Sequence, residues 1–293
     1  LKIYVWMDTQ SFVVLREGTA DWVKMGDSDN SMTTRCRYIT KGITIAILTS
    51  ILSFFGCGQQ SNSNMEKLSV TQTIYPTDHK LTMQERKDLT NKFLKQNGVP
   101  TLDHLPFVED YTVARFRDQK EVACKVVVVY GLLHVAYNEK TAEEMIAYYK
   151  KYNLWDYVSP KERMYLEKPT RTQEENNLVS WRIECLNVLL WSLRHFNTLP
   201  FPIEMCNFSD YKNLPNLEND PTEWISNSKL RNTEDILNET DMIYRIHWAV
   251  RDASLNGRPI PANINQDIVM ERHFALNWLV MYADEWDEVT TDT

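Results

Sequence analysis

The chain has 293 residues, of which 43% are hydrophobic and 11% aromatic, enough for a substantial core, and this excludes a largely disordered protein. Residues 1–56 hold six Lys or Arg and five Asp or Glu, so the rest carries 26 basic and 35 acidic residues and a net charge of -9, which argues against a nucleic-acid partner. Only three of the eight glycines lie beyond residue 80, which excludes a glycine-rich phosphate loop, a dinucleotide-binding fingerprint and a G-x-S-x-G nucleophile elbow there.

The first clear element is an uncharged apolar run at residues 42–55, which ends at Gly56 and Cys57. Basic residues precede the run: Arg35, Arg37 and Lys41. A basic segment, a short apolar segment and a small residue before the cleavage point are the three parts of a secretion signal. A cysteine directly after the small residue makes this segment resemble a bacterial lipoprotein signal, in which the cysteine receives lipid and becomes the first residue of the mature protein.

Phe54 and Phe55 depart from that pattern, because an aliphatic and a small residue usually stand at these two positions. An uncleaved membrane anchor is one alternative, but 14 apolar residues are fewer than the roughly 20 that span a bilayer. A buried core helix is the other, but nothing amphipathic precedes the run and a polar stretch follows it. We therefore expect lipid at Cys57 and attachment to a membrane of the bacterial cell envelope.

This assignment divides the chain into four parts. Because Met32 begins the basic segment, residues 1–31 look like upstream sequence translated from a start codon placed too early, and residues 32–56 are the signal. Residues 57–80, rich in Ser, Asn, Gln and Thr, are expected to form a polar tether. Residues 81–293 then form the folded domain.

Prolines divide that domain into segments, most of which carry the 3.6-residue apolar period of helices. Residues 81–98 begin with a capping box formed by Thr82 and Glu85 and should end at Gly98. Residues 120–138 are ambiguous because four consecutive valines favour a strand. The length of this segment and its charged start favour a buried helix.

Two further helix starts follow, at Thr141 with Glu144 three positions later, and at Ser159 with a proline after it. The strongest helical pattern spans residues 172–196 and has apolar residues over so wide an arc that we expect a central helix. Its apolar positions are Leu178, Trp181, Cys185, Leu186, Leu189, Leu190 and Leu193.

After a proline-broken loop at 198–221, residues 231–257 and 265–286 should form two long neighbouring helices. Trp286 should hold the C-terminus in place, with solvated acidic residues around it. The sequence therefore predicts a mainly α fold: a single multi-helix domain with proline-rich connecting loops.

Six segments of this domain resemble the successive signatures of a bacterial family called domain of unknown function 4272. They are KEVACKVVVVYGLLHVA, LWDYVSPKERMYL, WRIECLNVLLWSL, YRIHWAVRDA, IVMERHFALNWL and EWDEVTTDT. The resemblance runs from about residue 81 to the end of the chain. It implies a helix for the valine-rich segment, and it implies no activity because none is assigned to the family.

The last two predicted helices carry the residues best suited to acid-base chemistry. His247 and Arg251 share a face of one helix, and His273 and Asn277 share a face of the other, whereas Glu271 lies about 200° round from His273. If the helices pack side by side, two histidines with nearby carboxylates would form an acid-base or metal site. With Glu184 as a general acid, the catalytic hypothesis rests on Glu184, His247, Glu271 and His273.

The structural alternative is that these polar groups satisfy one another between packed helices, because tryptophans lie beside them. Buried Arg and Glu are almost always paired, so we expect ion pairs within a polar cluster of Arg182, Glu184, Arg245 and Glu271. Glu184 should neutralise an arginine such as Arg245 or Arg272, and Asp241 and Arg245 have i,i+4 spacing. No H-E-x-x-H or comparable pair of ligands is present, so we assign no metal and no cofactor.

Three cysteines remain beyond the signal: Cys124, Cys185 and Cys206. They show no C-x-x-C or Cys/His spacing for zinc. Cys124 and Cys185 lie in apolar helical patterns and are most simply buried thiols. A disulfide between two of the three is compatible with an envelope compartment, and the sequence does not identify the pair.

Two functions of different classes fit these features. The first is a lipid-anchored envelope protein whose helical domain binds another protein, for example as an immunity-type partner of a secreted toxin. The second is an envelope hydrolase that uses the Glu/His set, which requires these side chains to meet in an open cleft. The anchor, the acidity and the missing catalytic motif favour the first.

Overall fold

The structure is a computed structural model of the 293-residue chain. It describes the backbone of three strands within residues 4–24, and it describes residues 74–76, 79–207, 211–212 and 214–293 in full. The predicted signal at 32–56, the lipidation site Cys57 and most of the predicted tether at 57–80 lie outside these residues. The chain divides into two units, Leu1–Cys57 and Gly58–Thr293.

The first unit contains a three-stranded antiparallel sheet. β1 (Tyr4–Asp8) pairs with β2 (Ser11–Arg16), which pairs with β3 (Thr19–Lys24), in the order β1-β2-β3. Asp8 lies opposite Ser11 in the first pair of strands, and Arg16 lies opposite Thr19 in the second. We expected no structural element here, and the assignment of residues 1–31 to translated upstream sequence stays a prediction.

The second unit is helical, and its described residues contain no strand. Its helices are α2 (Met83–Gln96), α3 (Gln119–Ala136), α4 (Ala142–Lys151), α5 (Pro160–Glu167), α6 (Gln173–Ser180), α7 (Arg182–Ser192), α8 (Thr222–Asn227), α9 (Thr233–Leu255) and α10 (Gln266–Leu279). Short 3₁₀ turns lie at Trp155–Tyr157, Pro261–Asn263 and Trp286–Glu288. The predicted mainly α, multi-helix fold is confirmed.

The helices begin where their local sequence satisfies free backbone N–H groups. At α2 the Glu85 N–H donates to Thr82 Oγ1 over 3.2 Å, and the Thr82 N–H donates back to the Glu85 carboxylate over 2.9 Å. The same reciprocal box starts α4, α5 and α6. Gly98, at φ +74°, follows the end of α2 in the left-handed region that glycine adopts without strain.

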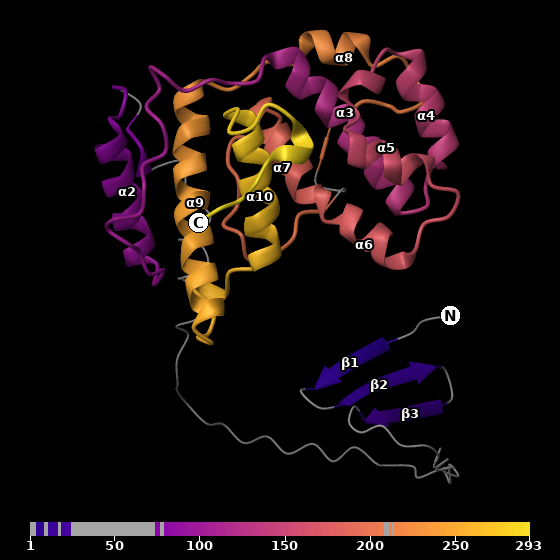
Figure 1. The fold of residues 1–293 in the computed structure, drawn as a ribbon, viewed down its shortest axis with the longest axis horizontal. Coiled ribbons are helices and arrows are strands. Elements are labelled where there is room, and N and C mark those ends of the chain that lie inside the picture. Colours follow the sequence, from indigo (N-terminus) through magenta and orange to yellow (C-terminus); the bar gives the residue numbers. More distant parts are fainter. Residues whose placement is uncertain are drawn as a thin grey trace, which may run out of the picture. The chain divides into compact units, whose positions relative to one another are not determined.

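The helices form a continuous packed series, in which α2 packs on α9, α9 on α10, α10 on α7 and α7 on α3. Figure 1 shows α2, α9 and α10 side by side, with α3, α4, α5 and α8 toward the opposite end of the unit. Helices α4, α6 and α8 also contact α3. The predicted central position of the helix around Leu189 is confirmed for α7, since it lies between α10 and α3 and Leu189 is fully buried.

The valine-rich segment is a helix, as predicted. Four consecutive valines, 126–129, are fully buried in α3. Because helices cover α3 on several sides, almost its whole circumference is apolar, which explains why its sequence lacks a clear amphipathic period. The Tyr149 hydroxyl of α4 donates to the Val128 carbonyl over 2.8 Å and ties the two helices together.

The predicted single helix over 172–196 is instead two helices, α6 and α7, separated at Trp181. The Glu184 N–H bonds the Trp181 carbonyl, an i to i−3 contact that tightens the turn and interrupts the helical period. Leu178 lies on α6, before this break. It was expected in the core and is instead 65% exposed. Among the described residues, no helix is long and apolar enough to cross a membrane.

Candidate functional site

Glu184 of α7 and Arg272 of α10 form a fully buried ion pair. Arg272 Nε lies 2.9 Å from Glu184 Oε2, and both side chains are 0% exposed. The second carboxylate oxygen of Glu184 accepts the Cys206 N–H over 2.7 Å, and Arg272 also donates to the Pro200 carbonyl. Both oxygens of Glu184 are thus engaged in joining two helices and the loop after α7.

A second ion pair joins the same two helices. Arg182 Nη1 lies 3.1 Å from the Glu271 carboxylate, and the guanidinium lies 4.3 Å from the centre of the Phe274 ring. The Cys185 thiol donates to the same carboxylate over 3.0 Å. Burial raises the pKa of Cys185 well above its usual value, so this side chain remains a neutral donor.

The cysteines of the helical unit are free thiols. Cys124 and Cys185 are buried, as predicted, and Cys206 is half-buried. Burial raises the pKa of Cys124 to about 11. Neither buried thiol has the low pKa of a reactive cysteine.

Arg245 belongs to a different part of the core. Its guanidinium makes two bonds to Asp241, of 2.9 and 2.7 Å, and both side chains are 1% exposed. This is the predicted i,i+4 pair on α9. Arg245 therefore does not pair with Glu184 or Glu271, and the four residues of the predicted polar cluster belong to three separate ion pairs.

His247 of α9 and His273 of α10 meet directly. Their Nδ1 atoms lie 2.8 Å apart, with the rings nearly perpendicular at 88°. Burial is the main cause that lowers the pKa of His247 to about 4 and that of His273 to about 3, with smaller contributions from Arg251 and from the other imidazole. Two neutral rings can form this bond only if one donates from Nδ1 and the other accepts, which requires opposite tautomers.

The proposed catalytic set does not form one site. The two histidines bond each other, while Glu184 and Glu271 bond arginines. None of these four side chains lines the cavity beside residues 79–81 or the cavity beside residues 156–160. Asn277, predicted beside His273, donates to the Thr290 carbonyl over 2.8 Å. Within the described part of the chain, no group of three or more His, Cys, Asp or Glu residues is placed to hold a metal.

The C-terminal segment is anchored, and sequence reasoning missed part of the anchor. Trp286 is buried as predicted, with the Lys125 ammonium 4.1 Å from its ring centre. Asp287, expected to be solvated, accepts bonds of 2.7 Å from the Ser159 hydroxyl and the Lys161 N–H at the N-terminus of α5. A carboxylate is favourable at that end of a helix. Lys125 itself is paired with Glu162 at 2.7 Å.

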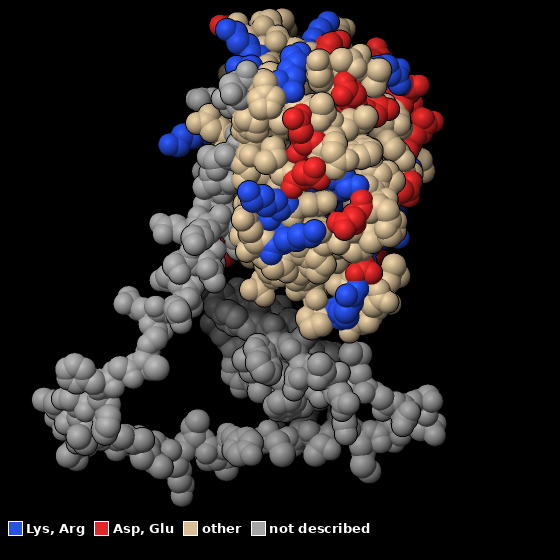
Figure 2. Space-filling model, turned by 90° about the vertical axis from the view of Figure 1, so that its left-hand side faces the viewer, with Lys and Arg blue, Asp and Glu red and all other residues tan. Residues whose placement is uncertain are grey.

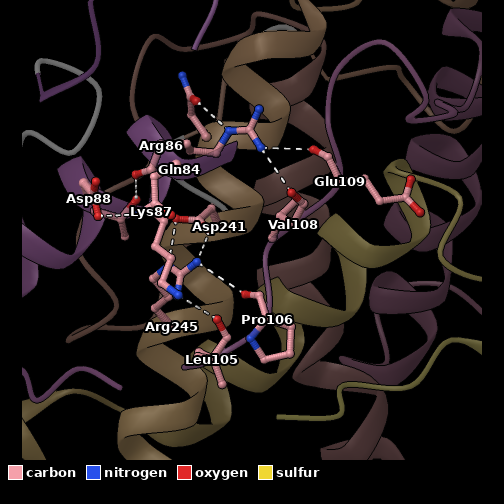
Figure 3. A network of polar contacts seen from close by, with 12 residues as sticks. Gln84, Arg86, Lys87, Asp88, Leu105, Pro106, Val108, Glu109, Asp241 and Arg245 are labelled. Atoms are coloured by element: carbon pink, nitrogen blue, oxygen red, sulfur yellow. Dashed lines mark hydrogen bonds and ion pairs between the residues drawn. The ribbon is translucent and has the colours of Figure 1, made fainter. Parts of the chain in front are cut away.

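A non-helical segment between α2 and α3, residues 103–117, is held to the domain through its backbone carbonyls. We call it the strap. Arg86 Nη1 donates to the Glu109 carbonyl over 3.0 Å, and Lys87 Nζ donates to the Leu105 carbonyl over 3.0 Å. Arg245 Nη2 lies 3.5 Å from the Pro106 carbonyl. Figure 3 shows these cationic side chains, from α2 and α9, converging on the backbone of the strap.

The far end of the strap is fixed by Arg117, which is 7% exposed. Its guanidinium donates to the Trp278 carbonyl in the last turn of α10 over 3.2 Å, and to the Ala283 carbonyl just beyond α10 over 2.8 Å. Two strap side chains nevertheless face solvent, with Phe107 45% and Val113 67% exposed. The strap is thus an ordered surface segment with apolar side chains on its outside.

A cavity of about 310 Å³ lies between residues 75–76 and 79–81, α2 and the first half of α9. Tyr75, Arg86, Asn238 and Glu239 contribute to its wall. Glu239 is only 4% exposed, and its carboxylate has no hydrogen bond or ion pair with any residue that the structure describes. Burial raises the pKa of Glu239 to about 7.

Sequence reasoning did not identify Glu239. The available signal is its position on α9, where it lies between the buried Ile236 and Ile243 at helical spacing. A carboxylate at a core position is paired with another group, is protonated, or serves a function. That signal could have selected Glu239, although it could not have revealed the cavity.

The surface around α2 carries no strong single-sign field. Figure 2 shows this face of the helical unit, where Lys and Arg side chains are interspersed with Asp and Glu. Such a distribution gives no basic stripe for a phosphate backbone.

A family model described as Domain of unknown function (DUF4272) matches residues 86–289. This match covers most of the helical unit, including the strap, the ion pairs of α7 and α10, and Glu239. No curated protein and no solved structure matches the chain.

Proposed function

We propose that this chain, which belongs to the DUF4272 family, is a lipid-anchored protein of the bacterial cell envelope whose helical domain binds another protein. One form of this proposal is that the chain is an immunity-type protein and that the protein it binds is a secreted toxin. The lipid at Cys57 and the tether would keep the domain close to the membrane.

The observation that carries the proposal is the way the strap is held. Buried Arg86, Lys87 and Arg245 bind its backbone carbonyls, so its conformation is fixed before any partner arrives. A surface ordered in advance loses less conformational entropy on binding than a flexible loop.

The outward side chains of the strap suit a protein partner. Phe107 and Val113 are large apolar groups on a segment whose polar backbone atoms are partly engaged inside the domain. Exposed apolar groups rimmed by charges are typical of protein-protein contacts, and aromatic side chains often contribute most of the binding energy.

The hydrolase alternative has no comparable support. Its four residues are buried and paired among themselves or with arginines, and none of them lines the cavity at Glu239 or the cavity beside residues 156–160. We therefore do not propose it.

Two experiments test the two parts of the proposal. Expression from Met32 in a bacterial host with a labelled fatty acid should label the wild type and not Cys57→Ser, and equal labelling would reject the anchor. To test the interaction, proteins bound to the full chain are crosslinked to it in cells and co-purified with it. The set of co-purified proteins is then compared between wild type, Phe107→Asp and Val113→Asp.

Both strap variants should lose the same bound protein while retaining the helical circular dichroism spectrum. Met164→Asp is the matched control, because Met164 is 71% exposed on α5, outside the strap. Retention of that protein by both strap variants would reject the strap as the binding surface.

A further inference from the structure

The wall of the cavity beside Glu239 contains polar groups that could bind a ligand. Its lining combines polar and apolar surface, and Glu239 contributes a carboxylate that is 4% exposed and unpaired among the described residues. A buried polar group without a partner is costly, and such groups are rare in folded proteins. The cavity beside Glu239 leaves space for a ligand to contact its carboxylate.

The nearest positive charges are already engaged. Arg272 of α10 and Arg231, ahead of α9, are the cations that face Glu239 and lower its pKa. Arg272 bonds Glu184 and the Pro200 carbonyl, and Arg231 bonds the Trp191 and Phe196 carbonyls. Neither forms an ion pair with Glu239.

The other charges of the cavity wall are also accounted for. Lys80 lies 2.9 Å from Glu234, and Asp235 lies 3.7 Å from Arg231. Arg86 bonds the Asn238 side chain over 3.3 Å and the carbonyls of the strap. Glu239 is therefore the carboxylate of this wall that lacks a cation of its own.

We propose that this cavity binds a small molecule through a protonated primary amino group placed against the Glu239 carboxylate. An ammonium group supplies both the missing charge and the missing donors, and a charge-assisted bond of this kind is stronger than a neutral one. The net charge of the chain, -8, also favours the approach of a cation over that of an anion. This site is distinct from the strap surface and does not depend on protein binding there.

Ammonium binding requires the ionised form of Glu239. The pKa of about 7 means that most of the population is protonated at pH 6, so binding at that pH should release a proton. Affinity should therefore rise from pH 6 to pH 8. The charged or ionisable groups that face the cavity from the elements packed around it are Tyr75, His79, Lys80, Arg86, Glu234 and Asp235, and Arg231 and Arg272 are the cations that act on the Glu239 carboxyl.

The test is isothermal titration calorimetry of the full-length protein with n-pentylamine, and with sodium pentanoate as the probe of equal length and opposite charge. Pentylamine should bind, and Glu239→Gln should weaken it by roughly tenfold or more, because the amide keeps the shape and removes the charge. Glu143→Gln, on the exposed face of α4, is the matched control and should bind as the wild type does.

The proposal is overturned if pentylamine does not bind, if Glu239→Gln binds it as tightly as the wild type, or if pentanoate binds as tightly as pentylamine. Titrations at pH 6 in two buffers with different ionisation enthalpies give a second measurement. A binding heat that does not depend on the buffer would exclude proton release from Glu239.

Discussion

Replacing Glu239 with Gln should stabilise the protein at neutral and alkaline pH. The folded domain raises the pKa of this carboxyl from its ordinary 4.5 to about 7. Below pH 4.5 the carboxyl is protonated in both the folded and unfolded chain, so it has no pH-dependent effect on stability. Between pH 4.5 and pH 7 the unfolded chain releases the proton more readily, and the folded state loses stability.

The size of the effect follows from that difference. Each unit of pKa corresponds to about 1.4 kcal/mol, so the wild type should lose about 3 kcal/mol relative to Glu239→Gln by pH 7, and the gap should then stay constant. For a domain of this length, about 3 kcal/mol corresponds to roughly 6 to 12 °C in Tm.

The assay is thermal unfolding of both proteins at several pH values from 4 to 8. The buried His247 and His273 also titrate in acid, but they are present in both proteins, so their effect cancels in the difference. The two Tm values should converge near pH 4 and separate as pH rises. A constant difference across this range, or a less stable Glu239→Gln protein at pH 8, would refute a buried carboxyl with a raised pKa.

Three other substitutions test the packing. Glu184→Ala should cost roughly 3 to 5 kcal/mol by leaving Arg272 unpaired in the core, whereas Glu174→Ala on the exposed start of α6 should change the denaturant midpoint little; similar midpoints would contradict the ion-pair account. Gly131→Ala should cost about 1 to 3 kcal/mol, because a Cβ there overlaps the Tyr149 hydroxyl and the Met145 methyl, and an unchanged melting temperature would show that these side chains move aside. Asp287→Ala should cost about 1 kcal/mol and speed hydrogen exchange at the start of α5, and unchanged exchange there would contradict a stabilising role for Asp287 at that helix end.

Local features of the fold were predictable because they depend on residues close in sequence. The capping boxes at Thr82 and Thr141 each need only a hydroxyl and a carboxylate three positions apart. The helix at the valine-rich segment followed from its length. The break at Trp181 was not predictable, since the apolar period runs through it without a proline or glycine.

The candidate site was less predictable because its contacts join distant parts of the chain. Sequence reasoning named both Arg272 and Arg245 as partners for Glu184, and only the packing of α7 on α10 distinguishes them. The cavity at Glu239 requires α2, α9 and residues 75–76 and 79–81 to meet, which no local pattern encodes. The strap was missed for the same reason, since its anchors come from two helices.

The central claim, that the strap is the binding surface, is tested most directly by photo-crosslinking in cells. A photoreactive amino acid replaces Val113 of the strap or, as the control, Leu255, which is 79% exposed at the end of α9. The account predicts a discrete crosslinked protein from position 113 and none from position 255. The same crosslinked protein at equal yield from both positions, or none from position 113, would contradict it.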